Sequence, residues 1–174
     1  MTATICVTSG CGGIPSARSR KGYCSTCAKN ARAAWSAMIA DKTSEREDRD
    51  AGFLTLFLRA DAAGRAAADA TRPRAMIVEQ HADVTDDSSP VSQSWYVPDG
   101  VCGFAWVSVR PGTSAFARWL VRHGVGTADR YAGGVTVWIR DYRQSYELKS
   151  AHAHAMAEVL RAAGFKATAH DRLD

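Results

Sequence analysis

The sequence predicts an α+β protein: an N-terminal four-cysteine module followed by helices, then a βαβαβ two-layer domain with helices packed on a small sheet. Three observations lead to this prediction. Four of the five cysteines lie within the first 27 residues, residues 28–62 are rich in alanine with apolar positions at helical spacing, and apolar runs alternate with amphipathic segments after residue 100. We therefore divide the chain into a metal-binding module (1–36), a helical connector (37–74) and an α/β domain (75–174).

The N-terminal cysteines form two short-spaced pairs. Cys6 and Cys11 are separated by four residues, Cys24 and Cys27 by two, and twelve residues lie between the pairs. This spacing suits one tetrahedral zinc ion. A segment so short and so poor in apolar residues needs the metal in order to fold, and four thiolates leave no open coordination position, so the predicted zinc is structural. Two disulfides or four separate thiols are the alternative interpretations.

The second cysteine pair stands where the alanine-rich helix is predicted to begin. This arrangement resembles zinc ribbons and treble-clef fingers, in which a zinc turn is followed by a helix that carries the last ligand. The resemblance covers about 35 residues and implies a helix N-terminus next to the metal, where the helix dipole stabilises thiolates. The chain departs from the usual pattern in its first pair, since Cys6 and Cys11 are four residues apart rather than two.

The predicted helical region has an apolar stripe at Ala34, Trp35, Met38 and Ile39. The charged run 41–50 interrupts this stripe, and apolar residues resume at 53–58, so the pattern leaves open whether residues 37–74 form one helix or two. Residues 83–94 predict a loop, because they are rich in aspartate, serine and proline. The segments 75–80 and 94–97 on either side of it are candidates for further strands.

The C-terminal region contains the best-defined elements. Residues 101–109 predict a buried strand with Cys102 as a core thiol, and 135–139 predict a second strand. Between them, Thr113 or Ser114 can cap a helix that buries Phe116, Trp119 and Leu120. Ser145 is predicted to cap a long helix that ends at Gly164, and residues 165–170 alternate as an edge strand.

Basic residues suggest two binding surfaces. Residues 1–36 contain five basic and no acidic side chains: Arg18, Arg20, Lys21, Lys29 and Arg32. Such a cluster can neutralise phosphates, and the alternative is a solvated loop. If the C-terminal strands are parallel, a second group collects at one sheet edge beside two helix N-termini: Arg110, Arg140, Tyr142 and Arg143. This predicted arginine edge could bind anions or stacked bases, and the alternative is that its arginines pair with Asp141 or Glu147.

Composition excludes several classes of protein. Apolar runs are too short to cross a bilayer, and residues 1–7 lack the basic and apolar regions of a secretory signal, so we expect a cytoplasmic protein with no membrane partner. The sequence contains no G-x-S-x-G, H-E-x-x-H or phosphate-loop motif. No catalytic residue is therefore predicted, and oligomeric state is left open.

The C-terminal half contains GFAWVSVRPG, FARWL, GGVTVWI and QSYELKSAHAHAMAEVLRAAGF, and it ends in RLD. These segments, within residues 95–174, resemble a family of small proteins encoded by actinobacteria and their bacteriophages, for which no activity is established. The resemblance implies a phage setting, with the host cytoplasm as location.

These observations together predict a small, non-enzymatic, zinc-stabilised nucleic-acid-binding protein. The first alternative is a factor that docks on a host protein through the zinc module. The second is an enzyme that acts on a phosphorylated substrate at the arginine edge.

Overall fold

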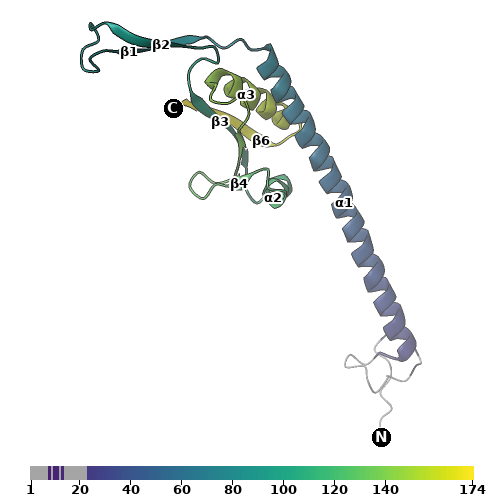
Figure 1. Cartoon of the computed structure of the whole chain (residues 1–174). Coiled ribbons are helices and arrows are strands. Elements are labelled where there is room, and N and C mark those ends of the chain that lie inside the picture. The colour runs from purple at the N-terminus through teal and green to yellow at the C-terminus, as the bar shows by residue number, and fades with distance from the viewer. Residues whose placement is uncertain (1–7, 9, 12, 14–22) are drawn as a thin grey trace. The chain divides into compact units, whose positions relative to one another are not determined.

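A computed structural model describes residues 8, 10, 11, 13 and 23–174 of the chain (Figure 1). It has an α+β fold, and its described part contains three helices and two small antiparallel sheets. Contacts divide the chain into two units, Met1–Asp50 and Ala51–Asp174, each of which is described by itself. Four residues predicted to bind ligands lie outside the described residues: Cys6, Arg18, Arg20 and Lys21.

The helical region is a single helix, α1, over Ser25–Ala70. The charged run does not end it, because it contains neither glycine nor proline and places opposite charges one turn apart. Arg46 and Asp50 are such a pair, with Nε 3.9 Å from Oδ2. Within the first unit the predicted apolar stripe is exposed, with Trp35 61%, Met38 38% and Ile39 47% accessible.

Strands β1 (Met76–His81) and β2 (Val91–Val97) form an antiparallel hairpin, as the two candidate segments predicted. The intervening loop is held by local hydrogen bonds, such as that between His81 Nδ1 and the Ser89 carbonyl at 2.6 Å. The hairpin is a sheet of its own, and the opposed residues Ile77 and Tyr96 are 66% and 70% exposed.

The second sheet has four strands in the order β4-β5-β3-β6. Its strands are β3 (Gly103–Arg110), β4 (Thr127–Ala128), β5 (Val135–Ile139) and β6 (Lys166–Leu173), with helices α2 (Ala115–Arg122) and α3 (Tyr146–Ala162) between them. All neighbouring strands are antiparallel. The element order βαββαβ with this strand order is the ferredoxin-like arrangement.

The expectation of parallel neighbouring strands is wrong, and the reason is β4. Each helix does connect two parallel strands, β3 to β4 through α2 and β5 to β6 through α3, but another strand lies between the members of each pair. Strand β4 contains two residues, too few to produce a recognisable alternation of apolar and polar side chains. When β4 is not recognised, the predicted element order is βαβαβ, and this order favours a parallel sheet.

Helix caps agree with the sequence in part. Ser114 caps α2, since its hydroxyl accepts a hydrogen bond from Ala117 N at 3.1 Å, and Gly164 follows α3 with φ 87°. Ser145 holds the N-cap position of α3, but its side chain makes no capping hydrogen bond. Cys102 is exposed rather than a core thiol, because β3 begins one residue after it.

The core of the second unit lies between one sheet face and the helices. Alternate residues of β3 point into it, namely Ala105, Val107 and Val109, and all three are fully buried. Helices α2 and α3 contribute side chains such as Phe116 and Leu160. The part of α1 within this unit belongs to the same core, since Ala60 is fully buried and the Phe53 ring lies 5.3 Å from that of Phe116.

Candidate metal centre

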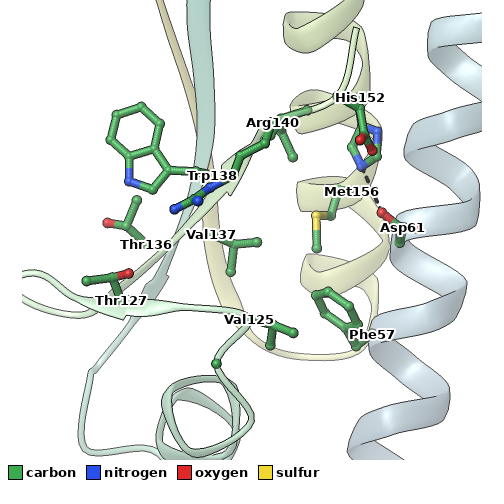
Figure 2. Close-up of a pocket in the computed structure, with 13 residues that line it drawn as sticks. Phe57, Asp61, Val125, Thr127, Thr136, Val137, Trp138, Arg140, His152 and Met156 are labelled. Atoms are coloured by element: carbon green, nitrogen blue, oxygen red, sulfur yellow. Dashed lines mark ion pairs between the residues drawn. The ribbon is translucent and has the colours of Figure 1, made fainter. Parts of the chain in front are cut away.

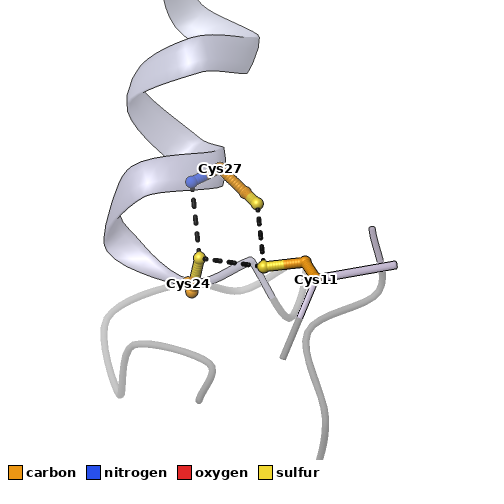
Figure 3. Close-up of side chains that lie close together, drawn as sticks. All are labelled: Cys11, Cys24 and Cys27. Atoms are coloured by element: carbon orange, nitrogen blue, oxygen red, sulfur yellow. Dashed lines mark hydrogen bonds between the residues drawn. The ribbon is translucent and has the colours of Figure 1, made fainter. Parts of the chain in front are cut away.

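Three of the four predicted zinc ligands lie together at the start of α1 (Figure 3). The Sγ atoms of Cys11, Cys24 and Cys27 all lie within 4.8 Å of one another. Cys11 Sγ is 3.7 Å from Cys24 Sγ and 3.4 Å from Cys27 Sγ. Cys24 is buried, whereas the other two are partly exposed.

The helix N-terminus positions two of these thiols. Cys24 is the residue before α1, and its carbonyl accepts the first helical hydrogen bond from Ala28 N at 2.9 Å. Its Sγ accepts a second bond, from Cys27 N at 3.4 Å. The C-x2-C spacing therefore places one sulfur at the N-cap and the other in the first turn. A backbone N–H and the positive end of the helix dipole both favour the thiolate form that binds metals.

Gly13 leaves the space that the sulfurs occupy. A Cβ at this position would lie 3.0 Å from Cys24 Sγ and 3.3 Å from Cys11 Sγ. The turn before it is closed by a hydrogen bond from Cys11 N to the Thr8 carbonyl at 3.1 Å. The absence of a side chain at Gly13 thus allows Cys11 to lie against the start of the helix.

The donor set and its spacing fit a thiolate metal site. With Zn–S bonds of about 2.3 Å, two sulfurs of one tetrahedron lie about 3.8 Å apart, close to the observed 3.4 and 3.7 Å. Cys11, Cys24 and Cys27 supply three sulfur donors. They lie close enough to hold a metal ion, and Cys6, the predicted fourth ligand, is outside the described residues.

Two predicted phosphate-binding residues follow the metal centre on α1. Lys29 and Arg32 are exposed, and their separation of three residues places them on one side of the helix. The thiol cluster and these two cations therefore belong to the same helical segment.

Comparisons with known protein families, with curated proteins and with solved structures give no match to this chain. Within residues 23–174, no helix combines the length and the apolar character that crossing a bilayer requires. Function must therefore be argued from the chemistry of the chain's own residues.

The structure does not form the predicted arginine edge. Because β3 and β5 are antiparallel, Arg110 and Arg140 lie at opposite ends of the sheet, roughly 20 Å apart along the strands. Tyr142 is engaged elsewhere, since its hydroxyl lies 2.9 Å from His152 Nδ1. Arg143 is 89% exposed and 3.9 Å from Asp99. These residues have no common edge at which to hold a phosphorylated substrate.

A cavity of about 340 Å³ lies beside β5 and contains a charged network that the sequence did not reveal (Figure 2). His152 on α3 is 1% exposed, and its Nε2 lies 3.3 Å from Asp61 Oδ1 on α1. The geometry is not that of a hydrogen bond, so we treat this contact as electrostatic. Asp61 Oδ2 accepts a hydrogen bond from Arg65 Nε at 2.8 Å, and Arg65 also pairs with Asp141 at 2.9 Å.

Burial determines the charge of His152. Loss of solvent lowers its pKa below the ordinary 6.5, and the nearby Asp61 only partly opposes this effect. The imidazole is therefore neutral at neutral pH. The described lining of the cavity contains the hydroxyls of Thr127 and Thr136 but neither a serine nor a cysteine.

Asp171 on β6 is the centre of a second polar cluster. Its carboxylate accepts hydrogen bonds from Tyr146 at 2.8 Å and Ser150 at 2.7 Å, and it lies 3.0 Å from His154 Nε2. Burial alone would raise the pKa of Asp171, but these three bonds together outweigh it and lower the pKa. A catalytic triad requires the serine to bond to the histidine. Here both bond to the aspartate, so the cluster joins α3 to β6.

Proposed function

We propose that this chain is a non-enzymatic nucleic-acid-binding protein whose N-terminal segment folds around one structural zinc ion. The observation that carries the proposal is the cluster of three thiols at the N-terminus of α1. Thiolates favour zinc among the common divalent ions, and Cys6 would complete a closed tetrahedral site. Such a site needs reduced thiols, so the proposal places the protein in the cytoplasm.

Nucleic acid is the proposed partner because of the charges around the metal centre. Arg18, Arg20 and Lys21 stand in the sequence between Cys11 and Cys24, and Lys29 and Arg32 are exposed just after Cys27. A metal bound by these cysteines would hold all five cations near one helix end. Phosphates neutralised by such an array release counterions, which makes affinity strongly dependent on salt.

The test is binding of the zinc-loaded full chain to nucleic acid over a series of salt concentrations. We expect log affinity to fall linearly with log salt, and the double variant Lys29→Glu/Arg32→Glu to reduce that slope by about 1.8, or 0.9 per contact. Arg118→Glu/Arg122→Glu, which reverses two exposed charges on α2, is the matched control. A slope that responds equally to both pairs would contradict a role for the zinc segment.

A protein partner is the second candidate, and the exposed stripe of α1 favours it. Met38 and Ile39 lie one turn after Trp35, and the three side chains are between 38% and 61% exposed. An apolar stripe of this kind can lie in a hydrophobic groove of another protein. Binding that ignores salt but is lost in Trp35→Ala would support this candidate over nucleic acid.

A further inference from the structure

The four-stranded sheet of the second unit has two different faces. Helices pack on the face formed by residues such as Ala105, Val107 and Val137. The side chains of alternate residues point to the opposite side, which we call the open face. Its members are Phe104, Trp106, Ser108, Arg110, Thr127, Thr136, Trp138, Lys166, Thr168, His170 and Arg172.

Three rings form a row across the open face. Trp106 on β3 is directly opposite Trp138 on β5 and His170 on β6. The Trp106 ring centroid is 4.9 Å from that of Trp138 and 5.4 Å from that of His170. The Trp106 and His170 rings are nearly parallel, with an angle of 14° between their planes. Trp138 is 40% exposed, and neither Trp106 nor His170 is fully buried. Trp106 therefore lies between the other two rings, and the ring surface most open to an incoming ligand is that of Trp138.

Cations lie on both sides of this row. On one side, Arg172 stands over the Phe104 ring at 5.3 Å, and at the far end of the sheet Arg110 is opposite Lys166. All three basic side chains are exposed. The strand positions of the open face contain no aspartate or glutamate. This charge is complementary to a polyanion.

A loop extends the open face at the β4–β5 end. Together with Trp106 and Trp138, its residues Arg130 and Tyr131 line a groove of about 400 Å³. The Tyr131 side chain is fully exposed. Asp129 also lines this groove, and its Oδ1 accepts hydrogen bonds from Tyr131 N and Ala132 N, both at 2.9 Å, which fix the loop.

The β1–β2 hairpin is also an exposed aromatic surface, but its charge differs from that of the open face. It also presents aromatic rings, with Trp95 43% and Tyr96 70% exposed. Residues 76–97, however, contain four acidic side chains and no lysine or arginine. Phosphates would be repelled there, so the open face is the surface that suits a nucleic acid.

We propose that the open face is a second binding site, which takes single-stranded nucleic acid by stacking unpaired bases on Trp138 and Trp106 while Arg110, Lys166 and Arg172 contact the phosphates. Aromatic side chains on a four-stranded sheet bind unstacked bases in this way in a widespread class of RNA-binding domain. Paired bases in a duplex have their faces covered, so double-stranded DNA fits this site poorly. The inference rests on the proposed function for its class of partner but uses a different unit of the chain.

The experiment measures binding of the zinc-loaded full chain to fluorescein-labelled oligouridine, oligothymidine and a duplex of mixed sequence by fluorescence anisotropy. We expect both single strands to bind and Trp138→Ala to weaken that binding about tenfold, the usual effect of one lost stacking contact. Trp138→Phe keeps an aromatic face and should recover most of the affinity. Trp95→Ala removes a tryptophan of similar exposure, 43% against 40%, from the β1–β2 hairpin and should leave oligonucleotide binding unchanged.

The outcomes separate this site from the zinc segment. Single-strand binding that is weakened by Trp138→Ala but not by Lys29→Glu/Arg32→Glu supports the open face even if the zinc segment proves inactive. Binding that depends on Lys29 and Arg32 and ignores Trp138→Ala overturns the open-face site and leaves the proposed function standing. Loss of self-association in Trp138→Ala with unchanged oligonucleotide affinity would also overturn it, because the face would then join two copies.

Discussion

The imidazole of His152 lies against Gly64, in space that any larger residue at position 64 would occupy. Gly64 is the middle residue of a buried row on α1, with Ala60 and Ala68 one turn to either side. Small residues at this spacing leave room on α1 for the His152 side chain of α3, whose Nε2 lies 3.3 Å from Asp61 Oδ1. The packing of the helices and the position of the buried histidine therefore depend on the same glycine.

Gly64→Ala is expected to destabilise the protein. A methyl group at this position overlaps the His152 ring, and overpacking of this kind costs about 1–3 kcal/mol, more than the roughly 1 kcal/mol that alanine gains over glycine in a helix. Denaturant unfolding should show a lower midpoint. The double variant Gly64→Ala/His152→Ala should be less destabilised than the sum of the two single changes.

Gly52→Ala is the matched control, because it makes the same change in the same helix. A Cβ at Gly52 meets nothing within 4 Å. Only the helix propensity changes, so this variant should be stabilised by roughly 0.5–1 kcal/mol. Equal effects of the two substitutions would show that His152 does not occupy the space beside Gly64.

The lowered pKa of His152 predicts a dependence of stability on pH. Burial lowers the folded-state pKa, whereas the unfolded chain takes up the proton near 6.5. The unfolded state therefore binds more protons below that pH, and stability falls as pH drops through about 6.5 until the folded-state pKa is reached. When pH is lowered from about 8 to about 5, the free energy of unfolding should decrease more steeply in the wild type than in His152→Gln.

His154→Gln provides the control for this measurement. His154 lies two residues along the same helix, but it is exposed and pairs with Asp171. His154→Gln should therefore retain the loss of stability at lower pH that is due to His152. If the two variants lose the same part of the pH dependence, the buried imidazole is not its source.

The sequence predicted most elements of the second unit but not their arrangement. Apolar runs identified β3 and β5, and Ser114 and Gly164 correctly marked helix ends, because these signals are local. Strand direction depended on β4, whose two residues carry no pattern. The predicted arginine edge was wrong for this reason, and the open face could not be recognised until the register placed Trp138 beside Trp106.

The candidate metal centre was more accessible to sequence reasoning. Cysteine spacing is a local property, and the structure confirms that Cys11, Cys24 and Cys27 come together. Contacts between distant residues carry no such signal. Asp61 and His152 are far apart in the chain, and only the packing of α1 on α3 makes them neighbours.

Tyr146→Phe is expected to destabilise the contact between α3 and β6. The Tyr146 hydroxyl donates to Asp171 Oδ1 at 2.8 Å, and loss of a hydrogen bond to a charged group costs about 1.5–3 kcal/mol when buried, less at this partly exposed site. The pKa of Asp171 is lowered from 3.8 in the folded protein. The ionised carboxylate therefore contributes to folding stability above that value, and this contribution is lost as pH falls through the folded-state pKa. The difference between wild type and variant in thermal unfolding should therefore shrink in acid.

Tyr131→Phe removes the same hydroxyl from a fully exposed ring and should leave stability unchanged. Ser150→Ala removes the donor to the other Asp171 oxygen and should act in the same direction as Tyr146→Phe. A difference between wild type and Tyr146→Phe that persists undiminished in acid would mean that the hydroxyl stabilises the fold without Asp171.

Replacement of the clustered cysteines is expected to abolish metal binding without removing the helix cap. Cys24→Ser keeps a side chain that can accept the hydrogen bond from Cys27 N, since serine is a good N-cap residue, but a hydroxyl is a poor zinc ligand. We expect about one zinc per wild-type chain, measured with a chelating dye after denaturation, and none for Cys24→Ser or Cys27→Ser. Cys102→Ser changes an exposed cysteine outside the cluster and should retain the metal. Full zinc content in Cys24→Ser would show that these three thiols do not form the site, whereas zinc lost only from the cluster variants would establish it.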